Sequence, residues 1–544
     1  MDERARRLIQ CGDHLYGKKQ PLLSLWQTIA EQFMPERADF TVNRGIGDEF
    51  ADHLYDSYPL IVRRELGDFL STLRRKDQEW FEVTVGREDR LNASGRKWLE
   101  YAGQVQRRAM YDRRAQFTRA LKAADHDYVT FGAPVLTIEP NLDSNTLLYQ
   151  CWHPRDCVWR FKVDGSIAEV HRKWCPTIRE LIVLFGKKTG ATLHQKVRDQ
   201  ADQSPFEEIE CRHIVTCIEE YEPEKRVKAQ TYTELYIDVS NEHVMFEAPL
   251  SNPKYIIPGW KRIAGSQYFH SPAVMVGLPD ARLIQAMSLT LLEAGEMAVR
   301  PPMAAKIDAI PDGVKLWSGG VTAIDAENDG RIQDIIAPIT NDTRALPFGL
   351  EMLQSKQQML ATAFYISKIN LPPLTHEMTA FEFQQRLQEY IRNVIPLFEP
   401  IDSEYHGQIC DLTFQILMEQ NAFGPLSDIP PSVRGDETEF RFDSPLSEAL
   451  ERQKGQRFME AKALVTEATT FDPACAGLVN WREALRDAMA GKRIPQKWMR
   501  TEDEVEAYAQ DLTAKQEAQQ QLALAQQGGD AMESLGRGAQ ALAE

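Results

Sequence analysis

Hydrophobic residues recur at helical spacing over two long stretches near the middle of the chain. The apolar positions of the first stretch recur at helical spacing: Leu346, Leu350, Leu353, Met359, Leu360 and Phe364. The second begins with a capping-box spacing near Thr379 and passes two kink points, Pro396 and Pro400, before its apolar periodicity resumes. The pattern predicts a helix over 346–366 and a longer, kinked helix over 379–421.

The segment between these helices, residues 367–378, is a loop. It contains Pro372 and Pro373, and consecutive prolines remove amide donors and restrict the residue before them. Two long helices joined by a stiff, poorly buried loop are more typical of a structural wall from which a loop projects than of an active-site scaffold.

A third long helix is predicted upstream, over 267–300, where Pro301 and Pro302 end it. Residues 301–345 have few hydrophobic positions and several turn signals, among them Pro311-Asp312-Gly313. This composition predicts a small strand-and-loop module held between two helices.

The ends of the chain complete an α+β, mainly helical protein. The first 130 residues are mainly helical in pattern, with an apolar stripe from Leu22 to Phe33, and residues 133–260 alternate in the manner of antiparallel strands. Strands and helices do not alternate regularly, so a doubly wound nucleotide-binding fold is not expected. A strand is predicted over 439–443, and beyond 481 the chain is helical and ends in a Gln- and Ala-rich tail with a disordered composition.

Composition and charge exclude some functions. The 544 residues include 63 Lys and Arg against 80 Asp and Glu, a net charge of −17. A protein that grips nucleic acid over its whole surface needs clustered cations, but an acidic protein can still let DNA slide past it. We expect no signal peptide and no membrane span, and eight cysteines without a framework of close pairs fit reduced thiols.

No catalytic signature is present, and we predict that the protein is not an enzyme. Gly186-Lys187-Lys188-Thr189-Gly190 has the wrong spacing for a phosphate loop, and no Gly-x-Ser-x-Gly elbow occurs. His376-Glu377 opens a zincin-like string that lacks its second histidine. A hydrolase with dispersed catalytic residues remains an alternative.

Two groups of cysteine and histidine raise the question of a metal site. They comprise Cys151, His153 and Cys157, and Cys211, His213 and Cys217. The second group falls on one face of a predicted strand, where a buried core face explains it and zinc is the alternative. We predict no metal and no cofactor.

The order of the parts resembles the portal, or head-to-tail connector, proteins of short-tailed bacteriophages, the podovirus-type head-tail connecting protein family. The run Trp26-x2-Ile29-Ala30-x2-Phe33-x-Pro35-x-Arg37-x2-Phe40 looks like the start of that family, as does Leu54-x-Asp56-Ser57 followed by a helix and then Trp80-Phe81. Residues 279–303 and 379–417 look like its stem and following long helix. The resemblance extends to about Met499 and depends on the order of these motifs.

The resemblance implies a division into named segments. The segments are a wing (1–266) with a return (422–480), two stem helices (267–300 and 346–366), a clip (301–345), a channel loop (367–378), a long kinked helix (379–421), and a crown with a flexible tail (481–544).

The resemblance also implies a role and a set of partners. The chain would form a homo-oligomeric ring, typically a dodecamer, at the portal vertex of the virion capsid, after assembly in the host cytoplasm. Double-stranded DNA would pass through it non-specifically during packaging and ejection. Its other partners would be the terminase packaging motor, the major capsid and scaffolding proteins and the tail adaptor, with no membrane involved.

If the chain forms such a DNA channel, the residues expected to contact DNA are Lys368, Asn370 and His376 in the loop and Lys356 in the preceding helix. A conduit needs a few cationic points on an acidic wall and no base-reading residues. The alternative for each cation is a salt bridge or a solvent-facing position. The rival function from another class is an internal virion or scaffold-like assembly protein without a DNA channel.

Overall fold

The computed structural model describes most of the chain with gaps. The described residues are 2–45, 47–49, 51, 54–74, 76, 79–87, 91–141, 146–186, 188–221, 231–263, 265–299, 303–305, 336–338, 346–366, 400–435, 437–442, 458–469, 472, 477–491, 498, 500, 504–516 and 519.

The chain divides into two compact units. The first comprises Met1–Gln78 and Ala109–Thr413, and the second comprises Glu79–Arg108 and Phe414–Glu544. The helices are α1 (Glu3–Phe33), α2 (Tyr58–Thr72), α3 (Ala93–Met110), α4 (Phe117–Phe131), α5 (Ile178–Phe185), α6 (Gln195–Gln200), α7 (Ile218–Tyr221), α8 (Leu278–Val299), α10 (Leu346–Ala363), α13 (Gly407–Glu419) and α15 (Trp481–Gly491). The strands are β1 (Phe81–Val85), β2 (Val135–Asn141), β3 (Thr146–Trp152), β4 (Cys157–Phe161), β5 (Ile167–Trp174), β6 (Cys211–Cys217), β7 (Tyr232–Asp238), β8 (His243–Leu250), β9 (Tyr255–Ile256), β10 (Met303–Ala305), β11 (Ile336–Pro338) and β12 (Thr438–Phe442).

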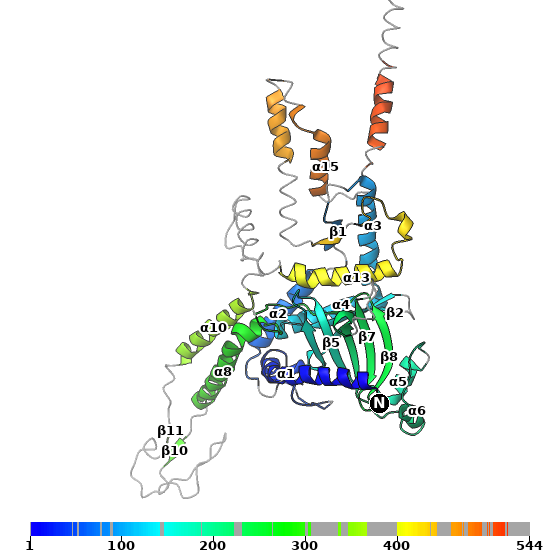
Figure 1. Ribbon diagram of the computed structural model, residues 1–544. Coiled ribbons are helices and arrows are strands. Elements are labelled where there is room, and N and C mark those ends of the chain that lie inside the picture. The colour runs from blue at the N-terminus through cyan, green and yellow to red at the C-terminus, as the bar shows by residue number, and fades with distance from the viewer. Residues whose placement is uncertain are drawn as a thin grey trace, which may run out of the picture. The chain divides into compact units, whose positions relative to one another are not determined.

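A five-stranded antiparallel sheet forms the centre of the first unit, in the order β4-β5-β6-β7-β8. Helix α1 runs across one face of this sheet (Figure 1). Its Ala5 and Leu8 pack on Ile214 and Leu235, while α5 and α6 pack on the opposite face around Cys211. Strand β6 is therefore buried on both faces, which explains why its sequence, CRHIVTC, lacks a solvent-facing polar alternation.

A second sheet, β3-β2-β9, packs against helix α4. Helix α4 is buried along most of its length and ends at Gly132, whose φ of 88° is the left-handed conformation that glycine adopts at a helix C-terminus. Tyr149 of β3 contacts Phe117 of α4 edge to face, with ring centroids 5.0 Å apart.

Helices α8 and α10 lie side by side and lead away from the sheets, with the short β10-β11 ladder beyond them (Figure 1). A π-helical turn, Ala273–Gly277, precedes α8, and a second π-helical turn, Ile401–His406, precedes α13 and follows Pro400. The ladder pairs Met303 with Pro338, so strands close the base of the segment between α8 and α10.

The second unit contains a two-stranded sheet and aromatic packing. Strand β1 pairs with β12, which lies more than 350 residues later in the chain, with Phe81 opposite Phe442. Phe440 packs edge to face on Phe81 and on Phe414, at centroid distances of 5.8 and 6.0 Å. Residues 458–469 and 504–516 are also helical.

The structure confirms an α+β protein in which helices predominate and the strands are antiparallel. Two sequence expectations were incomplete. Helix α1 begins at Glu3, well before the apolar stripe, and accommodates Pro21 in its interior. Strand β5 was not predicted, because Glu169, His171 and Lys173 occupy one of its faces where an apolar alternation would be expected.

Several predicted segments lie outside the described residues. These are the interior of the 301–345 module, the loop at 367–378, the helix from 379 to 399 and the C-terminal tail.

Candidate functional site: the α8–α10 helix pair and its attachment

Helices α8 and α10 approach each other closely at Gly349. A Cβ atom at this position would lie 2.9 Å from Cδ2 of Leu291, so glycine allows Leu291 to sit against the α10 backbone. An ion pair between Lys356 Nζ and Asp280 Oδ1, at 3.5 Å, adds a polar link across the pair.

The helix pair is fastened to the start of α2 through Asp56. The Oδ2 atom of Asp56 accepts hydrogen bonds from Ser288 Oγ of α8 at 3.0 Å and from Gln357 Nε2 of α10 at 3.2 Å. Gln285 adds three more bonds: its Oε1 accepts from the amides of Tyr55 and Asp56 at 2.8 and 2.9 Å, and its Nε2 donates to the carbonyl of Asp56 at 2.7 Å. One short segment of chain thereby sets the position of both helices.

An aromatic contact makes a second attachment, at the end of α1. The rings of Phe33 and Phe364 lie 5.3 Å apart, and both are fully buried. Gly277, in the π-helical turn before α8, lies against them, because a Cβ there would be 2.9 Å from Phe364 and 3.2 Å from Phe33. This contact holds the C-terminal end of α10 and the entry to α8 on α1.

Both attachments use residues of the motifs that carry the family resemblance. Phe33 belongs to the N-terminal run, and Asp56 belongs to Leu54-x-Asp56-Ser57. In the same run, Trp26 packs against Phe40 and Phe131, at centroid distances of 5.6 and 5.8 Å. In this chain the motif residues Phe33 and Asp56 therefore anchor the helix pair, and Trp26 packs in the core.

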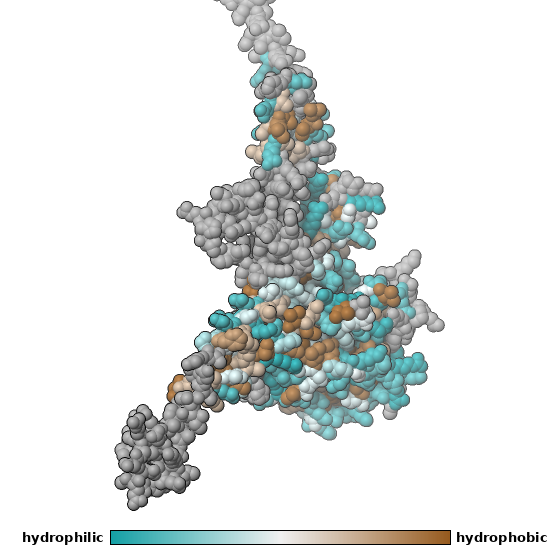
Figure 2. Space-filling model, turned by 90° about the vertical axis from the view of Figure 1, so that its left-hand side faces the viewer, coloured by the Kyte–Doolittle hydropathy of each residue, from teal (hydrophilic) through white to brown (hydrophobic). Residues whose placement is uncertain are grey.

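The helix pair exposes many large apolar side chains. They are Leu283, Leu292, Met297 and Val299 on α8 and Phe348, Leu350, Met352 and Met359 on α10. Leu292 is 58% exposed, Phe348 66% and Val299 82%. Figure 2 views the side of the molecule on which the pair lies and shows hydrophobic residues at its surface. Exposed large apolar side chains gathered on one pair of helices are typical of sites of protein–protein contact.

A buried ionic network lies at the turn before α13. Asp125 of α4 accepts two hydrogen bonds from the Arg74 guanidinium, one from Ser71 Oγ at 2.8 Å and one from Tyr405 Oη at 2.9 Å. Burial alone would lower the pKa of Arg74, but the Asp125 carboxylate outweighs it and the pKa is raised. The network thus joins the π-helical turn to α2 and α4 through a fully paired charge.

His406 extends this network as a neutral imidazole. Burial lowers its pKa, its Nε2 accepts from Arg74 Nη1 at 2.6 Å, and its Nδ1 donates to Asp402 Oδ1 at 3.0 Å. Each nitrogen of the ring therefore has a partner that fixes the tautomer.

Of the four DNA-channel candidates, the structure describes Lys356 alone. Lys356 is partly buried and pairs with Asp280 across the helix pair. Lys368, Asn370 and His376 lie outside the described residues.

The two cysteine–histidine groups are not gathered into ligand sets. His213 of β6 bonds to Tyr255 Oη at 2.6 Å and to Glu234 Oε1 at 2.8 Å, on the sheet face where Cys211 contributes to the apolar core. Cys151 Sγ donates to Asp127 Oδ2 at 3.6 Å. Packing and hydrogen bonding account for both groups.

No helix within the described ranges has the length and apolar content to cross a membrane.

The structure thus presents an anchored helix pair with exposed apolar side chains, a surface of the kind that occurs at protein–protein contacts. The chain belongs to the family of bacteriophage head to tail connecting proteins, whose model matches residues 5–499. It is 21% identical over 535 residues to the probable portal protein of Bordetella phage BPP-1, covering 96% of this chain and 93% of that protein. It is 19% identical over 539 residues to the portal protein of Salmonella phage epsilon15, with the same coverage. Among solved structures, a chain of the native gene transfer agent virion matches with a TM-score of 0.37 and 9% identity, over 75% of this chain and 86% of that chain.

Proposed function

We propose that this chain is a portal subunit, which forms a ring at one capsid vertex and serves as the conduit for DNA during packaging and ejection. The observation that carries the proposal is the extent of the similarity. The family model runs from residue 5 to residue 499, and both portal relatives align over 96% of this chain and 93% of their own lengths. The function is structural, and we assign no catalytic step to it.

The exposed apolar surface of α8 and α10 supports a ring. In a closed ring each subunit has a neighbour on either side, so side chains such as Leu292 and Phe348 would be buried between copies. Each helix of the pair exposes several of these side chains, as packing on two sides would require.

We assign the segments of the chain as the resemblance implies. The wing comprises 1–266 with the return 422–480, and the α8–α10 pair is the stem. The clip comprises 301–345, and the crown begins at 481. The loop at 367–378 is the channel loop, and the long kinked helix follows over 379–421.

The electrostatic character of the stem fits passage of DNA without retention. The described residues of α8 and α10 carry four acidic side chains and two basic ones, a net charge of −2. Lys356 forms an ion pair with Asp280. We therefore assign phosphate contact to Lys368, Asn370 and His376 of the loop.

The ring would assemble in the host cytoplasm and then reside at the portal vertex of the virion. Its partners there would be the major capsid and scaffolding proteins, the terminase motor during packaging and the tail adaptor afterwards. We assign the motor and adaptor contacts to the clip.

Imaging of the purified full chain by negative-stain electron microscopy, with mass photometry, tests the proposal. We expect closed rings with an axial hole. The Phe348→Ser variant should lose at least about tenfold in ring stability, because a buried aromatic side chain at an interface contributes about 2 kcal/mol or more. Glu351→Gln, an exposed change on the same helix, is the matched control.

Two outcomes would contradict the portal assignment. Protein that remains monomeric or dimeric at high concentration would contradict the prediction of a ring. Closed particles without an axial hole would favour a scaffold-like assembly protein. Deletion of residues 370–375 tests the loop separately, since rings should still form while packaging or retention of DNA declines.

A further inference from the structure

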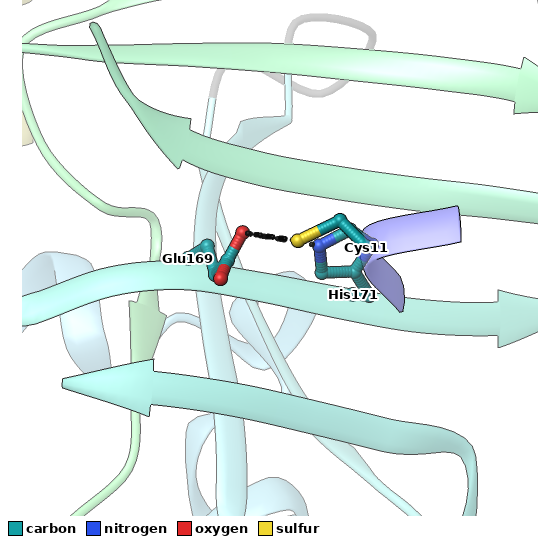
Figure 3. Close-up of side chains that lie close together, drawn as sticks. All are labelled: Cys11, Glu169 and His171. Carbon is teal, nitrogen blue, oxygen red and sulfur yellow. Dashed lines mark hydrogen bonds and ion pairs between the residues drawn. The ribbon is translucent and has the colours of Figure 1, made fainter. Parts of the chain in front are cut away.

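Three potential metal ligands meet between α1 and β5, in a place that the sequence did not indicate. Cys11 lies on α1, and Glu169 and His171 lie two residues apart on β5, so their side chains share the face that α1 covers. Figure 3 shows the three side chains pointing toward one another. One ligand atom from each residue lies within 4.8 Å of the other two.

The distances suit an ion of the size of zinc. Glu169 Oε2 lies 3.5 Å from Cys11 Sγ and 3.5 Å from His171 Nε2. Zinc bonds of about 2.0–2.3 Å in a tetrahedron place ligand atoms about 3.3–3.8 Å apart. Only a small movement of Cys11 and His171 would bring all three atoms onto one ion.

The two oxygens of the Glu169 carboxylate have partners at different distances. Its Oε1 accepts from Arg160 Nε at 2.7 Å, whereas Oε2 lies 3.5 Å from both Cys11 Sγ and His171 Nε2. The Glu169 side chain is 8% exposed and that of His171 is fully buried. A buried carboxylate oxygen normally has short, charge-assisted partners, and an ion held between the three side chains would supply one to Oε2.

The chain approaches closely at this point. A Cβ at Gly12 would lie 2.8 Å from His171 Nδ1 and 2.8 Å from Arg212 Nη1, so glycine at this position lets α1 pass close to the side chains of β5 and β6. Arg160 holds the carboxylate in place, as outer partners of metal ligands do.

We propose that Cys11, Glu169 and His171 bind one zinc ion, which fastens α1 to the middle of the five-stranded sheet. A thiolate, an imidazole and a carboxylate are the ligand types that zinc takes, and the exposed position of Cys11 leaves the fourth coordination position to water. Zinc displaces the thiol proton, which passes to solvent, and the charges of the thiolate and the carboxylate balance that of the ion.

The test uses the purified full chain, stripped with a chelator, reloaded with Zn²⁺ and passed through a desalting column before metal analysis. We expect one zinc per chain. Cys11→Ala should weaken Zn²⁺ binding by more than the roughly 10–100-fold that loss of an outer partner costs. Cys175→Ala is the matched control, because Cys175 is also exposed and lies outside the cluster.

Two further measurements keep the test independent of folding. Glu169→Gln keeps an acceptor for Arg160 and should also lose the ion. Co²⁺ should give the visible bands of a tetrahedral site and a thiolate charge-transfer band in the wild type and in Cys175→Ala, but not in Cys11→Ala. Zinc that is absent from the wild type, or retained equally by Cys11→Ala, would overturn the proposal, and ring formation does not enter into either result.

Discussion

At the scale of single residues, Asp56 links two helices although it lies in a loop, and we expect it to contribute to the stability of the fold. Its carboxylate accepts from Ser288 of α8 and from Gln357 of α10. Asp56→Asn removes the negative charge, and its amide NH₂ group is a donor that cannot accept the hydrogen bonds from Ser288 and Gln357. We expect the free energy of unfolding to fall by about 1–3 kcal/mol, the usual value for hydrogen bonds to a charged group.

Chemical denaturation of the subunit measures this change, with Glu351→Gln as an exposed control that should stay within about 0.5 kcal/mol of the wild type. Unchanged stability in Asp56→Asn would mean that Gln285 alone fixes the helix pair.

Lys19 is a second residue with an unusual setting. It is fully buried, and its Nζ donates to the carbonyls of Pro154 and Cys157, both at 2.5 Å. Three rings surround the same atom, those of Trp26, Trp159 and Tyr268, at 4.8–5.7 Å. Burial lowers the pKa of Lys19 from 10.5 to about 7.

This pKa predicts a dependence of stability on pH. Between about pH 7 and pH 10.5 the unfolded chain holds a proton on Lys19 that the folded chain releases, so stability rises with pH in this window and falls as pH drops toward 7. Relative to Lys19→Met, the wild type should gain about 1.4 kcal/mol per pH unit inside the window. Urea denaturation of both proteins at pH 7.5, 8.5 and 9.5 measures the difference. Parallel pH profiles would show that the carbonyls and rings keep the ammonium charged.

At the scale of elements, the turn into α8 is packed more tightly than the helix beyond it. Gly277→Ala should push the rings of Phe364 and Phe33 apart and cost about 1–3 kcal/mol, as overpacking does. Gly295→Ala on α8 meets nothing within 4 Å and should instead stabilise by about 1 kcal/mol through helix propensity. Thermal unfolding of the two variants provides the comparison, and equal effects would contradict the tight contact at Gly277.

The elements also show what a sequence pattern can and cannot predict. Helix α10 begins at the predicted residue, Leu346, and ends at Ala363 within the predicted range, because its apolar positions recur at helical spacing. Strand β5 was missed because its α1-facing side carries Glu169 and His171, whose burial depends on Arg160 and Cys11 far away in the chain. The Asp125 network was equally invisible, since Arg74, Asp125 and Tyr405 come from three separate segments.

At the scale of the whole molecule, the order of the segments was the informative signal. No single motif identified the chain, but the α+β region followed by paired helices around a small module matched the family that covers residues 5–499. Pairing of β1 with β12, which unites residues 79–108 with the C-terminal part in the second unit, could not be predicted. Such long-range strand pairing leaves no local pattern in the sequence.

The charge of the whole chain predicts how assembly should respond to salt. Each copy carries −17, so bringing many copies into one ring accumulates like charge, and the repulsion between exposed carboxylates is screened as salt is added. The contacts that we assign to the interface are apolar side chains of α8 and α10, which salt does not weaken.

The fraction of subunits assembled into rings should therefore rise between about 0.05 and 0.5 M NaCl, where the screening length falls from about 14 to about 4 Å. Mass photometry across this range measures the fraction, and Phe348→Ser should lower it at every salt concentration. Rings that dissociate as salt rises would show instead that ion pairs between neighbouring subunits dominate the interface.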